Sequence, residues 1–329
     1  MSARADDLPA AVPFTLNGRA ATAWPGESIL QAARRVGIEI PHLCHKDGLR
    51  ADGNCRDCMF EIDGERVLAP SCCRTPTAVM RVRTDTDRAD HAQKLVVELL
   101  QSEVAEAAAS YTRSSELDHW SARLGVDKPR FNGRPQPSAD LTHAAISVNL
   151  DACIQCLRCV RACREEQAND VIGYAGRGAS ARIVFDLDDT LGDSSCVACG
   201  ECVQACPTGA LMPANGVGKQ PTDRSVNSVC PYCGVGCQLT FQVADNRILF
   251  VEGRNGPANN GRLCVKGRYG FDYVTHRQRL TRPLVRRDEA PKRAELDIDF
   301  DNPLRDFREA SWEEAMQRAA DGLRDIRDG

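Results

Sequence analysis

Length, composition and charge place this chain among ordinary globular proteins and exclude several classes of function. Its 329 residues allow two to three domains, with 42% hydrophobic and 27% charged residues. A net charge of −4 predicts no nucleic-acid partner. No apolar run reaches the ~20 residues of a membrane span, and Met1–Pro13 lacks the pattern of a signal peptide. We therefore expect a cytoplasmic protein without a membrane partner.

Residues 11–84 are predicted to form a small unit of strands around one helix. Ser28 is expected to cap a helix at Ile29–Val36, and Asn17-Gly18 and Asp63-Gly64 are expected hairpin turns. The expected strands are Pro13–Leu16, Ala20–Ala23, Met59–Ile62, Arg66–Leu68 and Val79–Val82. Strands with one helix and a cysteine-bearing loop predict a β-grasp ferredoxin-like domain.

The segment 85–145 is predicted to be one long helix followed by a linker. Ala89–Ser110 carries apolar residues at helical spacing, and Lys128–Ser138 contains three prolines and a glycine. No cysteine occurs between Cys73 and Cys153. We therefore expect no cluster in this segment, with His91 and His119 at the surface or packed on a helix.

Residues 146–213 repeat one spacing, Cys-x2-Cys-x2-Cys-x3-Cys, on either side of an expected strand at Ala181–Phe185. This duplication predicts a domain with pseudo-twofold symmetry. Residues 226–329 form the last predicted unit, with strands at Leu239–Val243 and Ile248–Glu252 joined by a turn at Asp245-Asn246. A helix is expected at Trp312–Ile326, where Ser311 and Glu314 would form a capping box.

Sixteen of the seventeen cysteines fall into four sets of four, and only Cys73 is left over. The sets are Cys44/Cys55/Cys58/Cys72, Cys153/Cys156/Cys159/Cys163, Cys196/Cys199/Cys202/Cys206 and Cys230/Cys233/Cys237/Cys264. Disulfides fit poorly because no secretion signal is visible. Zinc sites usually pair two distant Cys-x2-Cys knuckles, whereas three cysteines at two-residue gaps let one loop hold three corners of an iron–sulfur cube. Iron–sulfur ligation is the favoured interpretation, and a structural zinc protein is the alternative.

The duplicated spacing also predicts which cysteines share a cluster. In bacterial two-cluster ferredoxins the fourth cysteine of each run ligates the other cluster. One [4Fe–4S] cluster is therefore expected on Cys153, Cys156, Cys159 and Cys206, and the other on Cys196, Cys199, Cys202 and Cys163. Pro207 follows Cys206 as this pattern expects, but Arg164 follows Cys163. We expect this departure to loosen one turn without removing a ligand.

The first cysteine set resembles a known type of [2Fe–2S] domain. The segments Pro41–Cys44, Gly53–Cys58 and Ser71–Arg74 are similar to those of the complex I large subunit, iron-only hydrogenases and NAD-dependent formate dehydrogenases. The resemblance implies one [2Fe–2S] cluster on this set. The spacing favours Cys72 over Cys73 as the fourth ligand.

The fourth set resembles the cluster-binding domain of molybdopterin oxidoreductases. Val229–Cys237 and Gly261–Arg268 carry this similarity, which implies a third [4Fe–4S] cluster on Cys230, Cys233, Cys237 and Cys264. In that family the lysine that matches Lys266 lies between the cluster and the pterin. Lys266 is therefore an expected cofactor-binding residue, and a solvated surface lysine is the alternative.

The order of these domains resembles the α subunit of cytoplasmic NAD-dependent formate dehydrogenase. The implied architecture is α+β: a β-grasp [2Fe–2S] domain, a long helix and linker, a two-cluster ferredoxin domain and the start of a molybdopterin oxidoreductase domain. The implied partners are flavin- and NAD-binding subunits and the remainder of the molybdopterin subunit. A molybdenum or tungsten bis-pterin guanine dinucleotide would belong to the full-length relative.

Most of the molybdopterin domain, with its catalytic metal ligand, would lie beyond Gly329. We therefore expect no catalytic residue within the chain and no formate oxidation by the chain alone, whether it is a fragment or a natural short subunit. The alternative is a stand-alone multi-cluster electron carrier that serves a hydrogenase or a complex I-like diaphorase.

Overall fold

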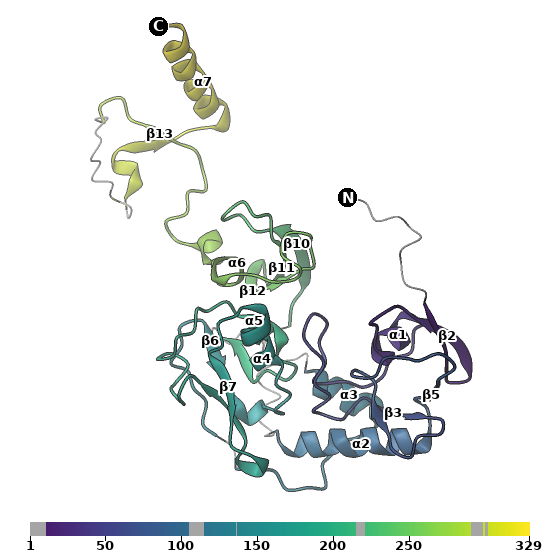
Figure 1. Ribbon diagram of the computed structural model, residues 1–329. Coiled ribbons are helices and arrows are strands. Elements are labelled where there is room, and N and C mark those ends of the chain that lie inside the picture. The colour runs from purple at the N-terminus through teal and green to yellow at the C-terminus, as the bar shows by residue number, and fades with distance from the viewer. Residues whose placement is uncertain (1–10, 105–114, 136, 215–220, 291–298, 300–301) are drawn as a thin grey trace. The chain divides into compact units, whose positions relative to one another are not determined.

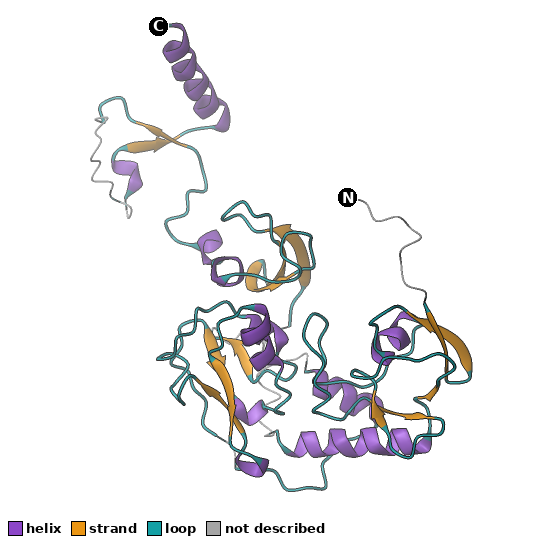
Figure 2. Cartoon of the chain, viewed as in Figure 1, coloured by secondary structure: helices purple, strands orange, loops and turns teal. Residues whose placement is uncertain are grey.

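The structure is a computed structural model, in which the chain divides into two compact units, Met1–Tyr269 and Gly270–Gly329 (Figure 1). It describes all residues except 1–10, 105–114, 136, 215–220, 291–298 and 300–301. Both units contain helices and strands (Figure 2), so the fold is a mixture of helix and sheet. None of the helices in the described part of the chain is both long and apolar enough to cross a lipid bilayer.

A five-stranded sheet in the order β2-β1-β5-β3-β4 begins the first unit. Its strands are β1 (Val12–Leu16), β2 (Arg19–Ala23), β3 (Met59–Ile62), β4 (Ala69–Pro70) and β5 (Arg81–Arg83). β1 pairs antiparallel with β2 through the predicted Asn17-Gly18 turn, and parallel with β5. Helix α1 (Ile29–Arg35) starts at Ser28, whose hydroxyl accepts a bond from the Gln31 amide in a complete capping box. Phe14, Leu30 and Phe60 are buried in the core between the sheet and this helix.

Two strands of this sheet differ from the prediction. The partner of β3 is Ala69–Pro70 rather than Arg66–Leu68, because the exposed residues that follow the Asp63-Gly64 turn do not pair with β3. The last strand begins at Arg81 rather than Val79. Val79 has a φ of +60°, a conformation that ends any strand. The β-grasp assignment itself stays a prediction.

The segment predicted as helix and linker contains two helices. α2 (Asp87–Ser102) is capped by Thr86 and ends before Glu103, and the remainder of the predicted helix, 105–110, lies outside the described residues. α3 (Glu116–Leu124) occupies part of the predicted linker, so the prediction of a linker was wrong for these residues. Ser115 caps α3, and Gly125 ends it in the left-handed conformation. The apolar side of α3 is buried through Leu117 and Trp120.

The duplicated domain consists of two short hairpin-like pairs and two short helices. β6 (Ile146–Val148) pairs with β9 (Leu211–Pro213), and β7 (Ile172–Ala175) pairs with β8 (Arg182–Phe185), the predicted strand. The helices are α4 (Arg158–Arg161) and α5 (Glu201–Ala205). α4 continues into a π-helical turn at Ala162–Glu166, which contains Cys163. The arginine that replaces proline at position 164 permits this continuation, because proline would break the helix.

A three-stranded antiparallel sheet and a short helix end the first unit. Its strands are β10 (Arg224–Val229), β11 (Gln238–Ala244) and β12 (Arg247–Gly253), followed by α6 (Val265–Tyr269). β11 and β12 confirm the two predicted strands, whereas β10 was not predicted. Asp245 and Asn246, with φ values of +48° and +58°, form the predicted turn between them.

The second unit contains β13 (Leu284–Arg286), which pairs with β14 (Phe307–Glu309), and helix α7 (Trp312–Asp328). Short 3₁₀ turns lie at Asp272–Thr275 and Pro303–Arg305. Ser311 caps α7 as predicted by accepting a bond from the Glu314 amide at 3.1 Å. The predicted capping box is incomplete, because the Glu314 carboxylate binds Arg308 of β14 instead.

Candidate iron–sulfur sites

The structure brings the first predicted set together on the loops beside the five-stranded sheet. Cys44, Cys58 and Cys72 are buried, and Cys55 is half-buried. The Cys44 amide donates to Cys55 Sγ at 3.4 Å. Hydrogen bonds from the thiols of Cys55 and Cys72 lower the pKa of Cys44, and a bond from Cys72 lowers the pKa of Cys58 to about 7. All four thiols are therefore close enough to share protons, which iron would replace on binding.

Cys73 lies at the exposed edge of this group. Its side chain is exposed, whereas Cys72 is buried and contacts the other thiols. The two neighbouring sulfurs are 3.6 Å apart. A Cβ atom on Gly53 would lie 2.8 Å from Cys73 Sγ, so the glycine lets the loop pass this close. The burial of Cys72 agrees with its prediction as the fourth ligand.

Asp57 is a buried carboxyl within the first site that the sequence analysis did not identify. The residue is 0% exposed, and neither carboxylate oxygen has a hydrogen-bond partner among the described residues. Burial raises the pKa of Asp57 well above its ordinary value, and the charges of Cys58 and Cys44 raise it further. An ionised Asp57 is therefore unfavourable beside thiolates.

In the structure, Cys206 lies with the first three cysteines of the first central set, and Cys163 lies near those of the second. An apolar cavity is lined by Cys153, Cys156, Cys159 and Cys206, together with Leu150, Ile154 and Leu211. Burial, followed by the charge of Cys206, raises the pKa of Cys153 to about 11. Burial is the largest cause of the raised pKa of Cys196, Cys199 and Cys202. The charge of Cys163 raises each of these pKa values further, so Cys163 lies near the second central set. Such effects fall with distance, so the structure groups the thiols as the crossed prediction requires.

The two central groups also lie close to each other. Burial and the charges of the thiols in its own group raise the pKa of Cys159, and the charge of Cys202 in the other group raises it further. Both thiols are buried. A buried thiolate is unfavourable unless a cation compensates it, so dry thiols of this kind suit iron, which supplies the positive charge.

The loops of the two central groups have matching backbone conformations. Gln155 and Ala198 both have a φ of +54°, and their amides donate to Cys153 Sγ and Cys196 Sγ at 3.4 Å. Left-handed backbone is costly for residues other than glycine. Here it turns an N–H group toward a sulfur, an interaction that tunes the potential of a bound cluster.

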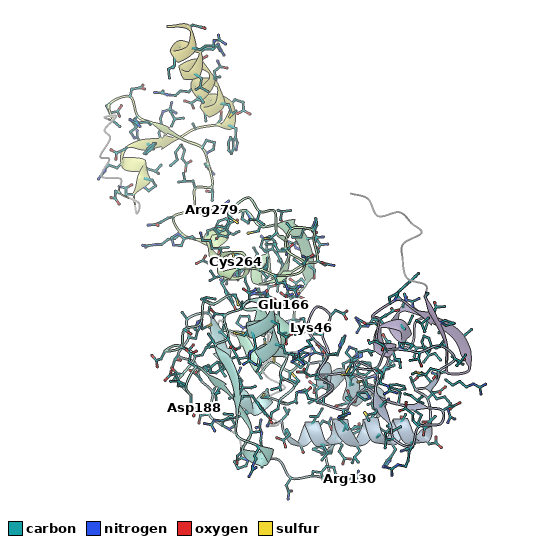
Figure 3. All side chains as sticks on the ribbon, viewed as in Figure 1. Lys46, Arg130, Glu166, Asp188, Cys264 and Arg279 are labelled. Atoms are coloured by element: carbon teal, nitrogen blue, oxygen red, sulfur yellow. The ribbon has the colours of Figure 1, made fainter. Side chains whose placement is uncertain are left out.

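The fourth set lies on the loops around the three-stranded sheet and is the most exposed. Cys230 and Cys237 are half-buried, and Cys233 and Cys264 are exposed; Figure 3 labels Cys264. The Cys230 amide donates to the Cys237 carbonyl at 2.8 Å. Burial, followed by the charges of Cys230, Cys233 and Cys264, raises the pKa of Cys237, so the four thiols again form one group.

Lys266 is exposed on α6, two residues after Cys264. This position satisfies both the cofactor-binding expectation and its alternative of a solvated lysine. His119 packs against the Trp120 ring, with centroids 5.1 Å apart, and His91 is exposed on α2. The predicted absence of a cluster between residues 85 and 145 stays a prediction.

Within the described ranges, no three His, Cys, Asp or Glu side chains converge as they would on one metal ion. A four-iron cluster spreads its thiolates over the corners of a cube, so its ligands are further apart than those of a single zinc ion. The thiols of each group are close enough to shift one another's pKa without converging on a single point.

Buried arginines beside the cysteine loops are functional candidates that the sequence analysis missed. Arg161 donates to the carbonyls of Cys44 at 2.6 Å and Cys156 at 3.2 Å, and thus joins two of the sites. Arg268 donates to the Cys199 carbonyl at 2.9 Å. Cys44 and Cys199 are 117 and 69 residues away from these arginines in sequence, so no local pattern could have revealed the contacts between domains.

Comparison with protein families gives three matches in chain order. Residues 9–87 match a 2Fe-2S iron-sulfur cluster binding domain, residues 152–210 a 4Fe-4S dicluster domain, and residues 223–276 a molybdopterin oxidoreductase Fe4S4 domain. The boundaries agree with the sheet, duplicated and three-stranded domains described above.

Two curated relatives cover most of the chain. It is 32% identical over 286 residues to a NADH-quinone oxidoreductase subunit of Rhizobium meliloti (strain 1021), covering 84% of this chain and 33% of the relative. It is 25% identical over 350 residues to a protein of Staphylococcus haemolyticus (strain JCSC1435) named "Putative formate dehydrogenase", covering 92% and 33%. The chain thus spans about a third of the length of these relatives.

Among solved structures, a chain of the NAD+-reducing [NiFe]-hydrogenase in its H2-reduced state is similar, with a TM-score of 0.57 and 27% identity. The similarity covers 62% of this chain and 88% of that chain. This protein therefore carries a 2Fe-2S domain, a 4Fe-4S dicluster domain and a molybdopterin oxidoreductase Fe4S4 domain in that order, and it is related to a NADH-quinone oxidoreductase subunit and to formate dehydrogenases.

Proposed function

We propose that this chain is the iron–sulfur relay portion of a formate dehydrogenase α subunit. It would carry electrons from a molybdenum or tungsten pterin site toward a flavin subunit that reduces NAD. The observation that carries this proposal is the exchange of Cys163 and Cys206 between the central thiol groups, because this arrangement belongs to two-cluster electron carriers. The similarity to a protein named putative formate dehydrogenase supports formate as the source of electrons, and both the direction of transfer and the cytoplasmic location stay predictions.

Four clusters are proposed, one for each thiol group. The first group would hold [2Fe–2S], and the two central groups and the fourth group would hold [4Fe–4S]. Bound clusters of this kind supply one-electron chemistry. The chain's own contribution is to bury the thiols, aim amides at their sulfurs and fix the spacing of the groups.

The contacts within Met1–Tyr269 support a continuous route. Arg161 connects the loop of Cys44 with the loop of Cys156, and Arg268 connects α6 with the loop of Cys199. Electrons would enter at the fourth group, where we propose that Lys266 provides a cation between the cluster and the pterin. They would leave at the first group.

Anaerobic purification with metal analysis and electron paramagnetic resonance (EPR) spectroscopy tests the cluster content. About 14 irons per chain are expected from one two-iron and three four-iron clusters. Stoichiometric zinc in place of iron would overturn the proposal. Co-expression with the downstream part of a related subunit tests the pterin assignment, since Lys266→Ala should then weaken pterin retention while all four clusters remain.

A second candidate function is a multi-cluster carrier in a hydrogenase or diaphorase complex. The similarity to a chain of the NAD+-reducing [NiFe]-hydrogenase favours it. The chain would then exchange electrons with a flavoprotein partner without any pterin. Rapid electron transfer to such a partner, unaffected by Lys266→Ala, would favour this candidate over the first.

A further inference from the structure

The two repeats of the duplicated domain place different side chains at equivalent positions. Cys153 and Cys196 begin the repeats, 43 residues apart, and every later cysteine keeps this offset. The helices α4 and α5 follow the second cysteine of each repeat. At the second and fifth residues after that cysteine, α4 carries Arg158 and Arg161, whereas α5 carries Glu201 and Gln204.

On α4, both arginines are buried against segments that precede the duplicated domain. The side chains of Arg158 and Arg161 are each 3% exposed. Arg158 binds the Glu116 carboxylate of α3 through two bonds of 2.7 and 2.8 Å. Arg161 pairs with Asp52 at 3.1 Å and donates to the Cys44 carbonyl. The first repeat therefore presents positive charge to the [2Fe–2S] domain and α3.

On α5, the equivalent positions bind the molybdopterin-type Fe4S4 domain. Glu201 Oε1 accepts from Arg268 Nη2 at 2.5 Å and from the Leu263 amide at 3.0 Å, and both side chains of this ion pair are buried. Gln204 donates to the Gly261 carbonyl at 3.0 Å and accepts from the Gly253 amide at 3.0 Å. The second repeat therefore presents an acid and an amide.

The residue before each helix adds a steric difference between the repeats to this difference in charge. Gly200 has a φ of +73°, and a Cβ atom there would lie 2.1 Å from Arg268 Cδ. The equivalent residue of the first repeat is Leu157, with a φ of +59°. Arg268 can therefore cross the second repeat only because position 200 is glycine. A leucine at this position would block it.

Further ion pairs join the same domains outside the helices. Glu165 and Glu166, in the π-helical turn after α4, bind Arg50 and Arg262 respectively, and Lys46 donates to the Gln204 carbonyl. Figure 3 labels Lys46 and Glu166. The Arg50 side chain is exposed, so its pair with Glu165 contributes little. Glu166 and Lys46 are half-buried and join each repeat to the other flanking domain, so these contacts hold the domains together without distinguishing them. The discrimination therefore comes from the fully buried positions on α4 and α5.

We propose that the charges at these equivalent positions determine which flanking cluster domain docks on each repeat, an arrangement that we call the charge code. The basic α4 receives the [2Fe–2S] domain, and the acidic α5, with its glycine, receives the Fe4S4 domain. Exchange of the two would bury Arg268 against Arg158 or Arg161, and burying like charges without partners is strongly unfavourable. Residues of two short helices would thus determine the order of the four sites in space. This inference depends on the proposed relay in one respect, namely that the docked domains hold iron–sulfur clusters.

The test uses the full chain and reads each docking face separately by hydrogen exchange. Glu201→Gln removes the charge that holds the Leu263 amide, so exchange at Leu263 should accelerate at least tenfold, while exchange in the [2Fe–2S] domain stays unchanged. Arg161→Gln should do the reverse. Arg182→Gln, which breaks the exposed Arg182–Asp188 pair in the same domain, is the matched control and should change neither face.

Charge reversal gives the decisive comparison. Glu201→Arg should abolish the magnetic coupling between the fourth cluster and its neighbour in EPR spectra while the iron content is retained. The double variant Glu201→Arg/Arg268→Glu should restore at least half of that coupling. Equal acceleration at both faces in either single variant, or no rescue by the double variant, would overturn the charge code. Absence of iron from the unaltered chain would instead overturn the proposed relay, and the exchange measurements would still decide the docking.

Discussion

At the scale of single residues, burial distinguishes two neighbouring cysteines of the first set. Cys72 is buried among the thiols of the first group, while the adjacent Cys73 is exposed. The spacing predicts Cys72 as the ligand, since it gives the gap that the resemblance expects, and this assignment stays a prediction. The spacing could not show the closeness of the two sulfurs at 3.6 Å.

Substitution of each of these cysteines makes the first prediction. Cys73→Ser should retain the full iron content and the [2Fe–2S] signal, because its thiol is exposed at the edge of the group, whereas that of Cys72 is buried within it. Cys72→Ser should lose that signal, or change its g values if Cys73 takes over as a ligand. EPR spectra of the two variants, prepared side by side, decide the point. Loss of the cluster in Cys73→Ser with retention in Cys72→Ser would reverse the assignment.

Asp57 makes the second prediction, which concerns pH. Its pKa in the folded chain is raised above the ordinary value of 3.8, chiefly by burial. A raised carboxyl pKa means that the folded state holds a proton that the unfolded state releases, so stability falls as pH rises above about 4. Asp57→Ala should remove this slope and stabilise the chain by about 1–3 kcal/mol at neutral pH, because an unpartnered buried polar group is lost.

The measurement for Asp57 is the free energy of unfolding in denaturant between pH 4 and 8. Asp57→Asn is the matched variant, because it cannot ionise but keeps polar atoms in the same place. It should lose the pH slope and gain less stability than Asp57→Ala. A parent chain whose stability rises over this range while both variants lie flat would show that Asp57 is ionised in the fold.

At the scale of secondary-structure elements, the predictions succeeded where the signal is local. The Asn17-Gly18 turn, the Ser28 cap and the Asp245-Asn246 turn each specify a backbone conformation within a few residues. Strand β4 was misplaced because the apolar pair Val67-Leu68 suggested a strand, whereas β3 pairs with Ala69 and Pro70. Helix α3 was missed although Ser115 and Gly125 offer a cap and a stop, because its polar surroundings resemble a linker.

Helix α3 makes the third prediction. Trp120 is 6% exposed and packs in one core cluster with Leu43 of the first site and Ile154 of the first central site. Trp120→Ala should therefore destabilise the chain by about 3–5 kcal/mol. Arg123→Ala, on the exposed side of the same helix, should cost within about 1 kcal/mol. Denaturant unfolding of both variants checks this, and equal small effects would show that residues 116–124 are a linker after all.

At the scale of the whole molecule, the sequence predicted the kinds of sites and their order better than their connections. The four cysteine sets were visible because ligand spacing is local. Arg161 and Cys44 are 117 residues apart in sequence, so their contact depends on how domains pack rather than on any motif. The same holds for Arg268 with Glu201. The first unit, Met1–Tyr269, contains all four groups, and the second unit, Gly270–Gly329, contains no cysteine.

The exchange of fourth ligands is the claim on which the relay depends, and one spectroscopic comparison tests it most directly. EPR spectra of Cys153→Ser, Cys206→Ser and Cys196→Ser are recorded on anaerobically prepared full chain. The crossed arrangement predicts that Cys206→Ser perturbs the same [4Fe–4S] signal as Cys153→Ser and leaves the signal altered by Cys196→Ser intact. If Cys206→Ser instead reproduces the spectrum of Cys196→Ser, each run holds its own cluster and the proposed arrangement is wrong.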